Sequence, residues 1–364
     1  MPDELPVLAI DGGAPSRPSP WPEPPTPEPA ADDDPVRGAE EALAAYLGLG
    51  PSLVVSYGTQ SEAYRAALGV AQPTVDRDEI VVPALLAEAA AEAAREAGWR
   101  IVPADLEADT GAISSRGLVR AISERTAGIV VVHAFGHPAV MSDILRVAED
   151  RSLAVIEDIA GSLGAAFRGA PAGRMGQAAV LLGRPGDPVT RGAFTIFAEE
   201  SAASATRSNR SAPLAEDDAR GVLAELRSLE DELTQRRRLA WELTFNMRGM
   251  KAVAPMPHGR WIHHAYPVYV VRIRGILWKR SLEDTVAAIR AEGVACEVAC
   301  GQPLQLDPAG AAALPDATRV GDDAFTVANR LPQELIAIPL HSNLTSKDMD
   351  QVAAALRKVE GRSI

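Results

Sequence analysis

Residues 128–133 read Gly-Ile-Val-Val-Val-His, residues 142–151 read Ser-Asp-Ile-Leu-Arg-Val-Ala-Glu-Asp-Arg, and residues 154–158 read Ala-Val-Ile-Glu-Asp. The first and third stretches are short and apolar without polar alternation, which is typical of strands buried on both faces of a sheet. The middle stretch has the apolar spacing of an amphipathic helix. We therefore expect a strand, a helix and a second strand parallel to the first.

The same alternation continues on both sides of this unit. Further strands are expected at 79–82, 100–103, 178–182 and 193–198, and helices at 37–48, 86–97, 116–125 and 214–247. Strands that alternate with helices indicate an α/β fold, with a mostly parallel sheet covered by helices. The helix at 214–247 carries three consecutive arginines at 236–238, which we interpret as a solvated face.

The chain divides into three parts. Residues 1–36 are rich in proline and are expected to form an extended arm that wraps or links. Residues 37–247 would form the large α/β domain. Residues 248–364 alternate again, with strands expected at 266–273 and 336–340 and helices at 282–292 and 347–359, and would form a smaller C-terminal α/β domain.

Composition narrows the classes of partner. The net charge is −13 and basic clusters are lacking, which argues against nucleic acid and anionic membranes. No apolar stretch is long enough to cross a bilayer and no signal peptide is apparent, so we expect a cytoplasmic protein. The two cysteines, Cys296 and Cys300, have no histidine nearby in sequence, so we expect packing residues and no metal site.

Parallel sheets bind ligands at the carboxyl ends of their strands, where His133 and Asp158 are expected to lie. His133 is either an acid–base group or a hydrogen-bonded polar residue at a strand end. The turn Gly58-Thr59-Gln60-Ser61 opens a helix. Its amides and hydroxyls would hold a phosphate, or the turn is a simple helix start.

The order of several motifs is specific, although each motif alone is weak. Ser-Tyr-Gly-Thr at 56–59, Asp-Glu-Ile-Val-Val-Pro at 78–83, Val-Val-His-Ala-Phe-Gly-His-Pro at 131–138 and Val-Ile-Glu-Asp at 155–158 are followed by Ile-Pro-Leu-His at 338–341. In this order the chain resembles the DegT/StrS family of fold-type-I aminotransferases, which depend on pyridoxal phosphate (PLP). The resemblance covers nearly the whole chain and implies a seven-stranded type of sheet, a dimer, and a place in amino-sugar, aminocyclitol or antibiotic biosynthesis.

The resemblance also implies roles for individual residues. Gly58, Thr59, Gln60 and Ser61 would bind the cofactor's phosphate, and Asp158 would pair with the protonated pyridine nitrogen, unless it only caps the next segment. Asn209, in a loosely matched Ser-Asn-Arg, would be a cofactor contact made to the partner subunit.

The match fails at the lysine that forms the Schiff base with PLP. An alignment through the glycines at 164, 169, 173 and 176 puts Asp187 at the lysine position. The chain's only lysines are Lys251, Lys279, Lys347 and Lys358, so the large domain has none. Arginine cannot replace lysine, because its guanidinium does not become the neutral amine that attacks an aldehyde. The cofactor-stacking aromatic residue after Pro83 is also missing.

Three hypotheses remain open. The first is a pseudo-aminotransferase, which acts as a partner subunit of an active paralogue or without cofactor on a sugar-like or cyclitol-like ligand. The second is an enzyme that holds PLP or its amine form, pyridoxamine phosphate (PMP), non-covalently, with Asp187 as general base; otherwise Asp187 lies in a solvated turn. The third is an ordinary aminotransferase with a lysine from the small domain, such as Lys251, or from a partner chain. A homodimer or a heterodimer is expected.

Overall fold

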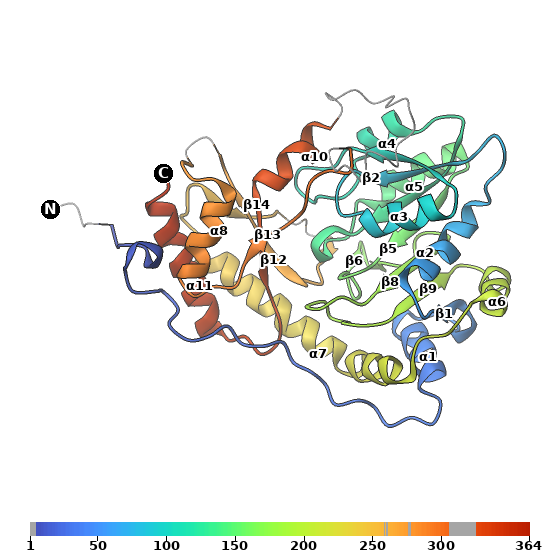
Figure 1. The fold of residues 1–364 in the computed structure, drawn as a ribbon, viewed down its shortest axis with the longest axis horizontal. Helices are drawn as coiled ribbons and strands as arrows, with labels where there is room; N and C mark the ends of the chain where they lie inside the picture. The colour runs from blue at the N-terminus through green and yellow to red at the C-terminus, as the bar shows by residue number, and fades with distance from the viewer. Residues whose placement is uncertain (1–4, 258, 260, 276–277, 306–324) are drawn as a thin grey trace.

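The computed structural model describes residues 5–257, 259, 261–275, 278–305 and 325–364. Seven strands form the larger sheet, in the order β1-β9-β8-β5-β4-β2-β3 (Figure 1). Their bounds are β1 Val54–Ser56, β2 Glu79–Pro83, β3 Arg100–Ala104, β4 Thr126–Val132, β5 Ala154–Asp158, β8 Ala178–Leu182 and β9 Ala193–Phe197. The central strands run parallel, whereas β9 is antiparallel to both of its neighbours. The expected α/β fold with a mostly parallel sheet is confirmed.

Helices cover both faces of this sheet. They are α1 Pro35–Leu47, α2 Gln60–Leu68, α3 Glu88–Glu96, α4 Ser115–Ala121, α5 Met141–Arg151, α6 Glu200–Asn209 and α7 Glu216–Asn246. The face that carries Val130 and Ile156 packs against α2 and α3, and the face that carries Ile129 and Val155 packs against α4 and α5. Even-numbered and odd-numbered residues of β4 and β5 therefore point to opposite faces, as the pleat of a strand requires.

A second, antiparallel sheet has the order β10-β12-β14-β13. Its strands are β10 Val253–Pro255, β12 Val268–Ile273, β13 Glu297–Val298 and β14 Leu335–Pro339, and it packs with α8 Leu282–Ala291 and α11 Ser346–Gly361. Short elements complete the described chain: β6 Ala166–Phe167, β7 Ala170–Pro171, β11 Ile262–His263, α10 Thr326–Arg330, and single 3-10 turns η1 Ala9–Asp11, η2 Pro51–Leu53, η3 Gly69–Ala71, η4 Ala134–Gly136 and η6 Leu331–Gln333.

The long helix α7 belongs to both cores. Leu229 and Leu233 pack in the cluster that contains α1, whereas Leu239 and Leu243 pack in the cluster of the second sheet. Burial of one continuous helix in two cores fixes the two sheets relative to each other. In Figure 1 this helix extends from beneath α1 to α11. None of the described helices is long and apolar enough to cross a membrane.

The proline-rich segment is an extended arm that follows α7 from the second sheet to α1 (Figure 1). At one end, Glu292 accepts hydrogen bonds from the amides of Ala9 and Ser16, at 2.7 and 2.8 Å. Arg17 forms a buried ion pair with Asp348 at 3.0 Å.

The other end of the arm is attached to the start of α7. Ala30 donates its amide to the carbonyl of Arg220 at 3.1 Å, and the Arg220 side chain donates to the carbonyl of Asp32 at 2.7 Å. The segment was expected either to wrap around the protein or to link parts of it, and in the structure it wraps along α7.

Several details differ from expectation. α4 ends at Ala121 and not at 125, and β1 and α6 were not anticipated. The interpretation of the three arginines of α7 as a solvated face is wrong for Arg236, which is only 2% exposed and pairs with Glu232 at 2.6 Å, whereas Arg238 is exposed. Cys296 and Cys300 are buried free thiols, as expected of packing residues, and burial raises the pKa of each to about 12.

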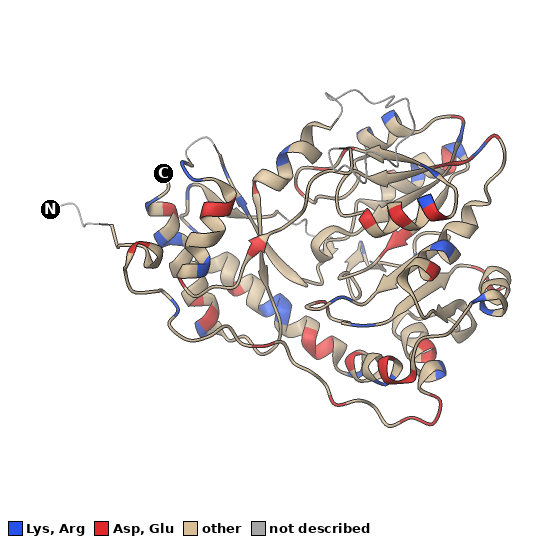
Figure 2. Cartoon of the chain, in the orientation of Figure 1, with Lys and Arg blue, Asp and Glu red and all other residues tan. Residues whose placement is uncertain are grey.

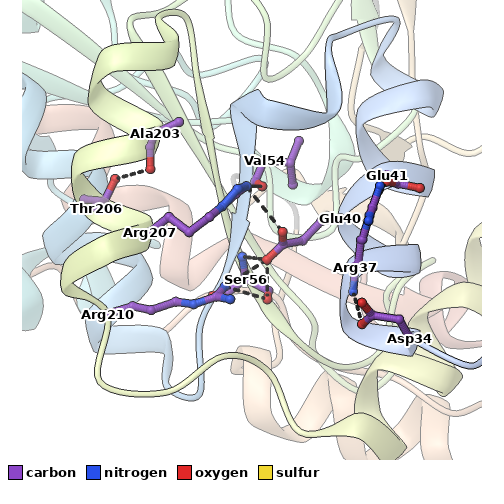
Figure 3. A network of polar contacts seen from close by, with 10 residues as sticks. All are labelled: Asp34, Arg37, Glu40, Glu41, Val54, Ser56, Ala203, Thr206, Arg207 and Arg210. Atoms are coloured by element: carbon purple, nitrogen blue, oxygen red, sulfur yellow. Dashed lines mark hydrogen bonds and ion pairs between the residues drawn. The ribbon is translucent and has the colours of Figure 1, made fainter.

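A buried carboxylate on α1 joins three elements of the large half (Figure 3). Glu40 accepts hydrogen bonds from the amide and hydroxyl of Ser56 on β1, at 2.9 and 2.8 Å. It also pairs with Arg210 at 2.9 Å and with Arg207, on α6, at 3.3 Å. Neighbouring Glu41 pairs with Arg37, and both side chains are well exposed.

This contrast predicts different effects of two adjacent substitutions. Glu40→Ala leaves the β1 amide and two arginines without their acceptor, so we expect it to lower the free energy of unfolding by about 3 kcal/mol. Glu41→Ala removes one exposed ion pair and should cost less than about 0.5 kcal/mol. Urea unfolding of both variants measures the difference, and equal losses would contradict the role given to Glu40.

Candidate functional site

The carboxyl end of β5 places two acidic side chains on opposite faces of the sheet. Asp158 points to the face covered by α2, where the hydroxyl of Tyr64 donates a hydrogen bond to its Oδ2. The amide of Ala160 donates to its Oδ1 at 2.9 Å. Asp158 is 1% exposed and Tyr64 is 1% exposed. Burial, together with the nearby charge of Asp158, raises the pKa of Tyr64 well above its usual value, so the phenol keeps its proton.

His133 lies on the other face. Its Nε2 is 2.9 Å from Glu157, and its Nδ1 accepts the amide of Ala139 at 2.9 Å. Both ring nitrogens are therefore engaged in the interior, which is the geometry of the hydrogen-bonded polar residue. The amide of His133 donates to the carbonyl of Asp158 at 3.2 Å, but the two side chains lie on opposite faces of the sheet, because Glu157 and Asp158 alternate on β5.

The turn at 58–61 opens α2, but polar groups of the chain engage it. Thr59 is the N-cap and accepts the amide of Glu62 at 3.2 Å. The carboxylate of Glu62 lies in the first turn, where its Oε1 accepts the amide of Ser211 at 3.2 Å. The hydrogen bonds from Ser211 hold the pKa of Glu62 below its usual value. A negative charge thus lies at the positive end of this helix.

The rest of this turn is also occupied. Ser61 donates its hydroxyl to Glu96, the last residue of α3, at 2.6 Å. The amide of Gly58 donates to the carbonyl of Ala212 at 3.0 Å. Gln60 is exposed at the first position of α2.

Asp187 lies at the end of a tight turn and points inward. The amide of Asp187 donates to the carbonyl of Arg184 at 3.0 Å, and Gly186 takes φ +92°, as the Pro-Gly sequence favours. The side chain lies against Gly161, where an added Cβ would be 2.9 Å from Oδ1. Its Oδ2 is buried without a hydrogen-bond partner among the described residues. The sequence predicted this turn. The carboxyl of Asp187 points into the protein, so it is not the solvated group that the alternative interpretation expected.

The electrostatics around Asp187 connect it to Asp158. Burial raises the pKa of Asp187 to about 7, the arginines at 184 and 236 oppose this increase, and the charge of Asp158 adds to it. Burial also lowers the pKa of Arg236, whose Nη1 donates to the carbonyls of Gly186 and Tyr266 at 3.0 and 3.2 Å. Arg236 therefore ties α7 to the turn that carries Asp187.

Two of these residues were not anticipated from the sequence. Tyr64 lies one helical turn after Gln60, but Gln60 is exposed and Tyr64 is buried, so their i, i+4 spacing gave no signal for the contact with Asp158. Arg236 was obscured by its arginine neighbours. The presence of Glu232 four residues earlier was the signal for a paired, buried side chain.

The remaining expected residues lie apart from this site. Asn209 is the exposed last residue of α6, and its side-chain amide donates a hydrogen bond to the carbonyl of Ala205 at 2.9 Å. The ammonium of Lys358 pairs at 2.9 Å with Glu292, the residue that binds the amides of the N-terminal arm. The charged groups that act on the pKa of Asp187 include no lysine. Within the described ranges, no group of three or more His, Cys, Asp or Glu residues has the geometry to hold a metal ion.

A small pocket is lined in part by Tyr266, whose carbonyl accepts a hydrogen bond from Arg236. This pocket of about 20 Å³ lies among Phe135, His137, Tyr266 and Tyr269. That volume holds roughly one water molecule. The rings of His264 and Tyr266 stack at 3.8 Å and help to fill the gap.

The raised pKa predicts the effect of pH on Asp187→Asn. Between pH 4 and pH 7 the folded chain keeps the proton that the unfolded chain releases, so the contribution of Asp187 to stability falls as pH rises through this interval. The asparagine variant lacks this loss. Relative to wild type, we expect it to gain up to about 4 kcal/mol between pH 4 and pH 8. Urea unfolding across this range measures the gain, and parallel pH profiles would contradict a buried carboxyl.

Comparison with known proteins relates this geometry to a family. A model of the DegT/DnrJ/EryC1/StrS aminotransferase family matches residues 34–192 and 212–357. The erythromycin biosynthesis sensory transduction protein EryC1 of Saccharopolyspora erythraea is 27% identical over 340 residues, which cover 87% of this chain and 88% of the relative. GDP-perosamine synthase of Caulobacter vibrioides is 26% identical over 344 residues, which cover 88% of each.

Solved structures show the same fold at lower identity. The structure of DesI in the presence of its TDP-sugar product aligns with a TM-score of 0.85 and 22% identity, over 98% of this chain and 97% of the other. 3-Amino-5-hydroxybenzoic acid synthase aligns with a TM-score of 0.77 and 18% identity, over 94% of this chain and 100% of the other. On the family match, which spans most of its length, the chain belongs to the DegT/DnrJ/EryC1/StrS aminotransferase family.

Proposed function

We propose that this chain is a pseudo-aminotransferase of the family, which does not carry out lysine-dependent transamination. In this proposal it serves an amino-sugar or aminocyclitol pathway, as a partner subunit of an active paralogue or as a cofactor-independent protein for a sugar-like or cyclitol-like ligand. One observation carries it: side chains of the chain itself engage the three places that the resemblance assigns to the cofactor and its lysine.

The first place is the acceptor for the pyridine nitrogen. Asp158 has the position for that role, but the phenol of Tyr64 already donates to its Oδ2. A cofactor ring would have to share that oxygen with a fully buried hydroxyl, or displace the hydroxyl and leave it without an acceptor. Such a loss costs about 1–3 kcal/mol.

The second place is the phosphate cradle at the start of α2. The carboxylates of Glu62 and Glu96 lie on the residues that would bind the phosphate dianion. Glu96 is the last residue of α3, which also has glutamates at 88 and 92. In Figure 2 this helix carries the red of acidic residues along its length. Like charges at hydrogen-bond range oppose phosphate binding.

The third place is the lysine itself. Asp187 offers a buried carboxyl that cannot form a covalent bond to an aldehyde. Taken together, the described residues do not fit PLP or PMP in the manner of the family, so the first proposal gives neither group a chemical role.

A second candidate function keeps Asp187 as an acid–base group. A pKa of about 7 is the value that a general base needs near neutral pH. Its unpartnered Oδ2 would accept a proton from a ligand that reaches it. With non-covalent PLP or PMP, this role would require Tyr64 to share Asp158 with the cofactor ring or to leave it; with a sugar-like ligand alone, it would not.

Cofactor titration tests the first proposal. We expect the wild-type protein to show no visible absorbance from bound PLP, and borohydride reduction followed by peptide mass analysis to find no stoichiometric adduct. The double variant Tyr64→Phe/Glu62→Gln frees Asp158 and removes one charge from the cradle. Its affinity for PLP should rise at least about tenfold, because the variant no longer has a buried hydroxyl that would lose its acceptor when PLP binds.

The matched control is Tyr46→Phe/Glu41→Gln, which makes the same chemical changes at exposed contacts away from the site. Its PLP affinity should equal that of wild type. Tight stoichiometric PLP in the wild-type protein would overturn the proposal. Turnover of a sugar-like ligand that is lost in Asp187→Asn would favour the second candidate.

A further inference from the structure

A basic groove lies on the second sheet, away from the site described above. It is formed where β12 ends, between the start of β10 and the turn η6, and encloses about 940 Å³. Its charged lining residues are Lys251, Arg272, Arg274, Arg330 and Glu334. Four cationic side chains and one carboxylate thus meet in a chain whose net charge is −13.

Internal pairing neutralises only part of this charge. Glu334 is shared by Arg272 at 2.7 Å and Arg330 at 3.3 Å. Asp109 approaches Arg272 at 3.9 Å, and its side chain is 73% exposed. Within the described chain, Lys251 and Arg274 are exposed and form no ion pair. The groove therefore keeps a positive balance of about two charges, enough for a phosphate dianion.

Arg272 provides the most specific feature of the groove. Its side chain is only 16% exposed, and pairing of β12 with β10 and β14 fixes its backbone. Its Nε donates to Glu334, but its Nη2 is buried without an acceptor among the described residues. A guanidinium stays protonated, so this unmet donor is costly until an anionic oxygen binds it.

The wall of the groove is also held in place. Glu360, on α11, accepts the backbone amides of Lys251, Ala252 and Val253 at 2.8, 2.6 and 3.0 Å. This carboxylate is 8% exposed, so the chain that carries Lys251 is fixed from beneath. A rigid wall reduces the ordering cost when a ligand binds.

We propose that this groove binds a small molecule that carries a phosphate or diphosphate group. Arg272 supplies the buried donor, with a planar guanidinium suited to phosphate oxygens, and Lys251 and Arg274 supply charge at the rim. The inference does not depend on the proposed function, because none of its residues contacts Asp158 or Asp187.

Isothermal titration of the full chain tests it, with inorganic phosphate, pyrophosphate and glucose 1-phosphate as probes and chloride at matched ionic strength as background. The variant Lys251→Gln/Arg274→Gln removes the two rim charges. The control Lys347→Gln/Arg146→Gln removes the same charge from exposed positions outside the groove. We expect pyrophosphate to bind at least about tenfold more weakly to the groove variant, and within about twofold of wild type to the control.

A third variant tests the geometry of the donor. Arg272→Lys keeps the charge and loses the planar fork, so it should weaken binding while thermal unfolding reports that the chain is folded. If glucose 1-phosphate binds more tightly than inorganic phosphate, the ligand is a phosphate ester; equal affinities indicate a free anion. Absence of binding by all three probes, or equal weakening in the groove and control variants, would overturn the proposal.

Discussion

The two adjacent carboxylates at the end of β5 determine how both faces of the large sheet are assembled. Alternation along the strand sends Glu157 to one face and Asp158 to the other. Burial alone would raise the pKa of Glu157, but hydrogen bonds from His133 and from the amides of Gly173 and Gly176 lower it below its usual value. The ionised carboxylate therefore holds the turn that leads into β8. Asp158 fixes α2 in the same way through Tyr64.

Apolar runs and helical spacing were sufficient for most of the fold, because buried parallel strands have a distinctive pattern. β5 and β8 were predicted at their observed bounds, 154–158 and 178–182, and β2 and β3 within one residue. The direction of β9 was not predictable, since a fully buried strand reads the same whether it runs parallel or antiparallel. β1 has only three residues, too few for a periodic signal.

The candidate site was harder to predict, because its contacts join distant parts of the chain. Tyr64 and Asp158 are 94 residues apart, and no local pattern pairs a helix phenol with a strand-end carboxyl. The inward direction of Asp187 depends on the absence of a side chain at Gly161, which sequence spacing does not reveal. Arg236 was misinterpreted because an arginine run is solvated far more often than it is buried. The absence of lysine before residue 251, in contrast, is visible in the sequence alone.

The arm has a consequence for the order in which the chain folds. Arg17 and Asp348 are 331 residues apart, and Glu292 holds Ala9 across 283 residues. During synthesis residues 9–17 emerge long before Glu292 and Asp348, so Arg17 must remain without this partner until α11 has left the ribosome. Contacts this distant in sequence form late and slowly. A protein truncated before α11 would lose the partner of Arg17 but keep Glu292 and Arg220, so proteolysis of the proline-rich segment would report how far the docking of the arm depends on α11.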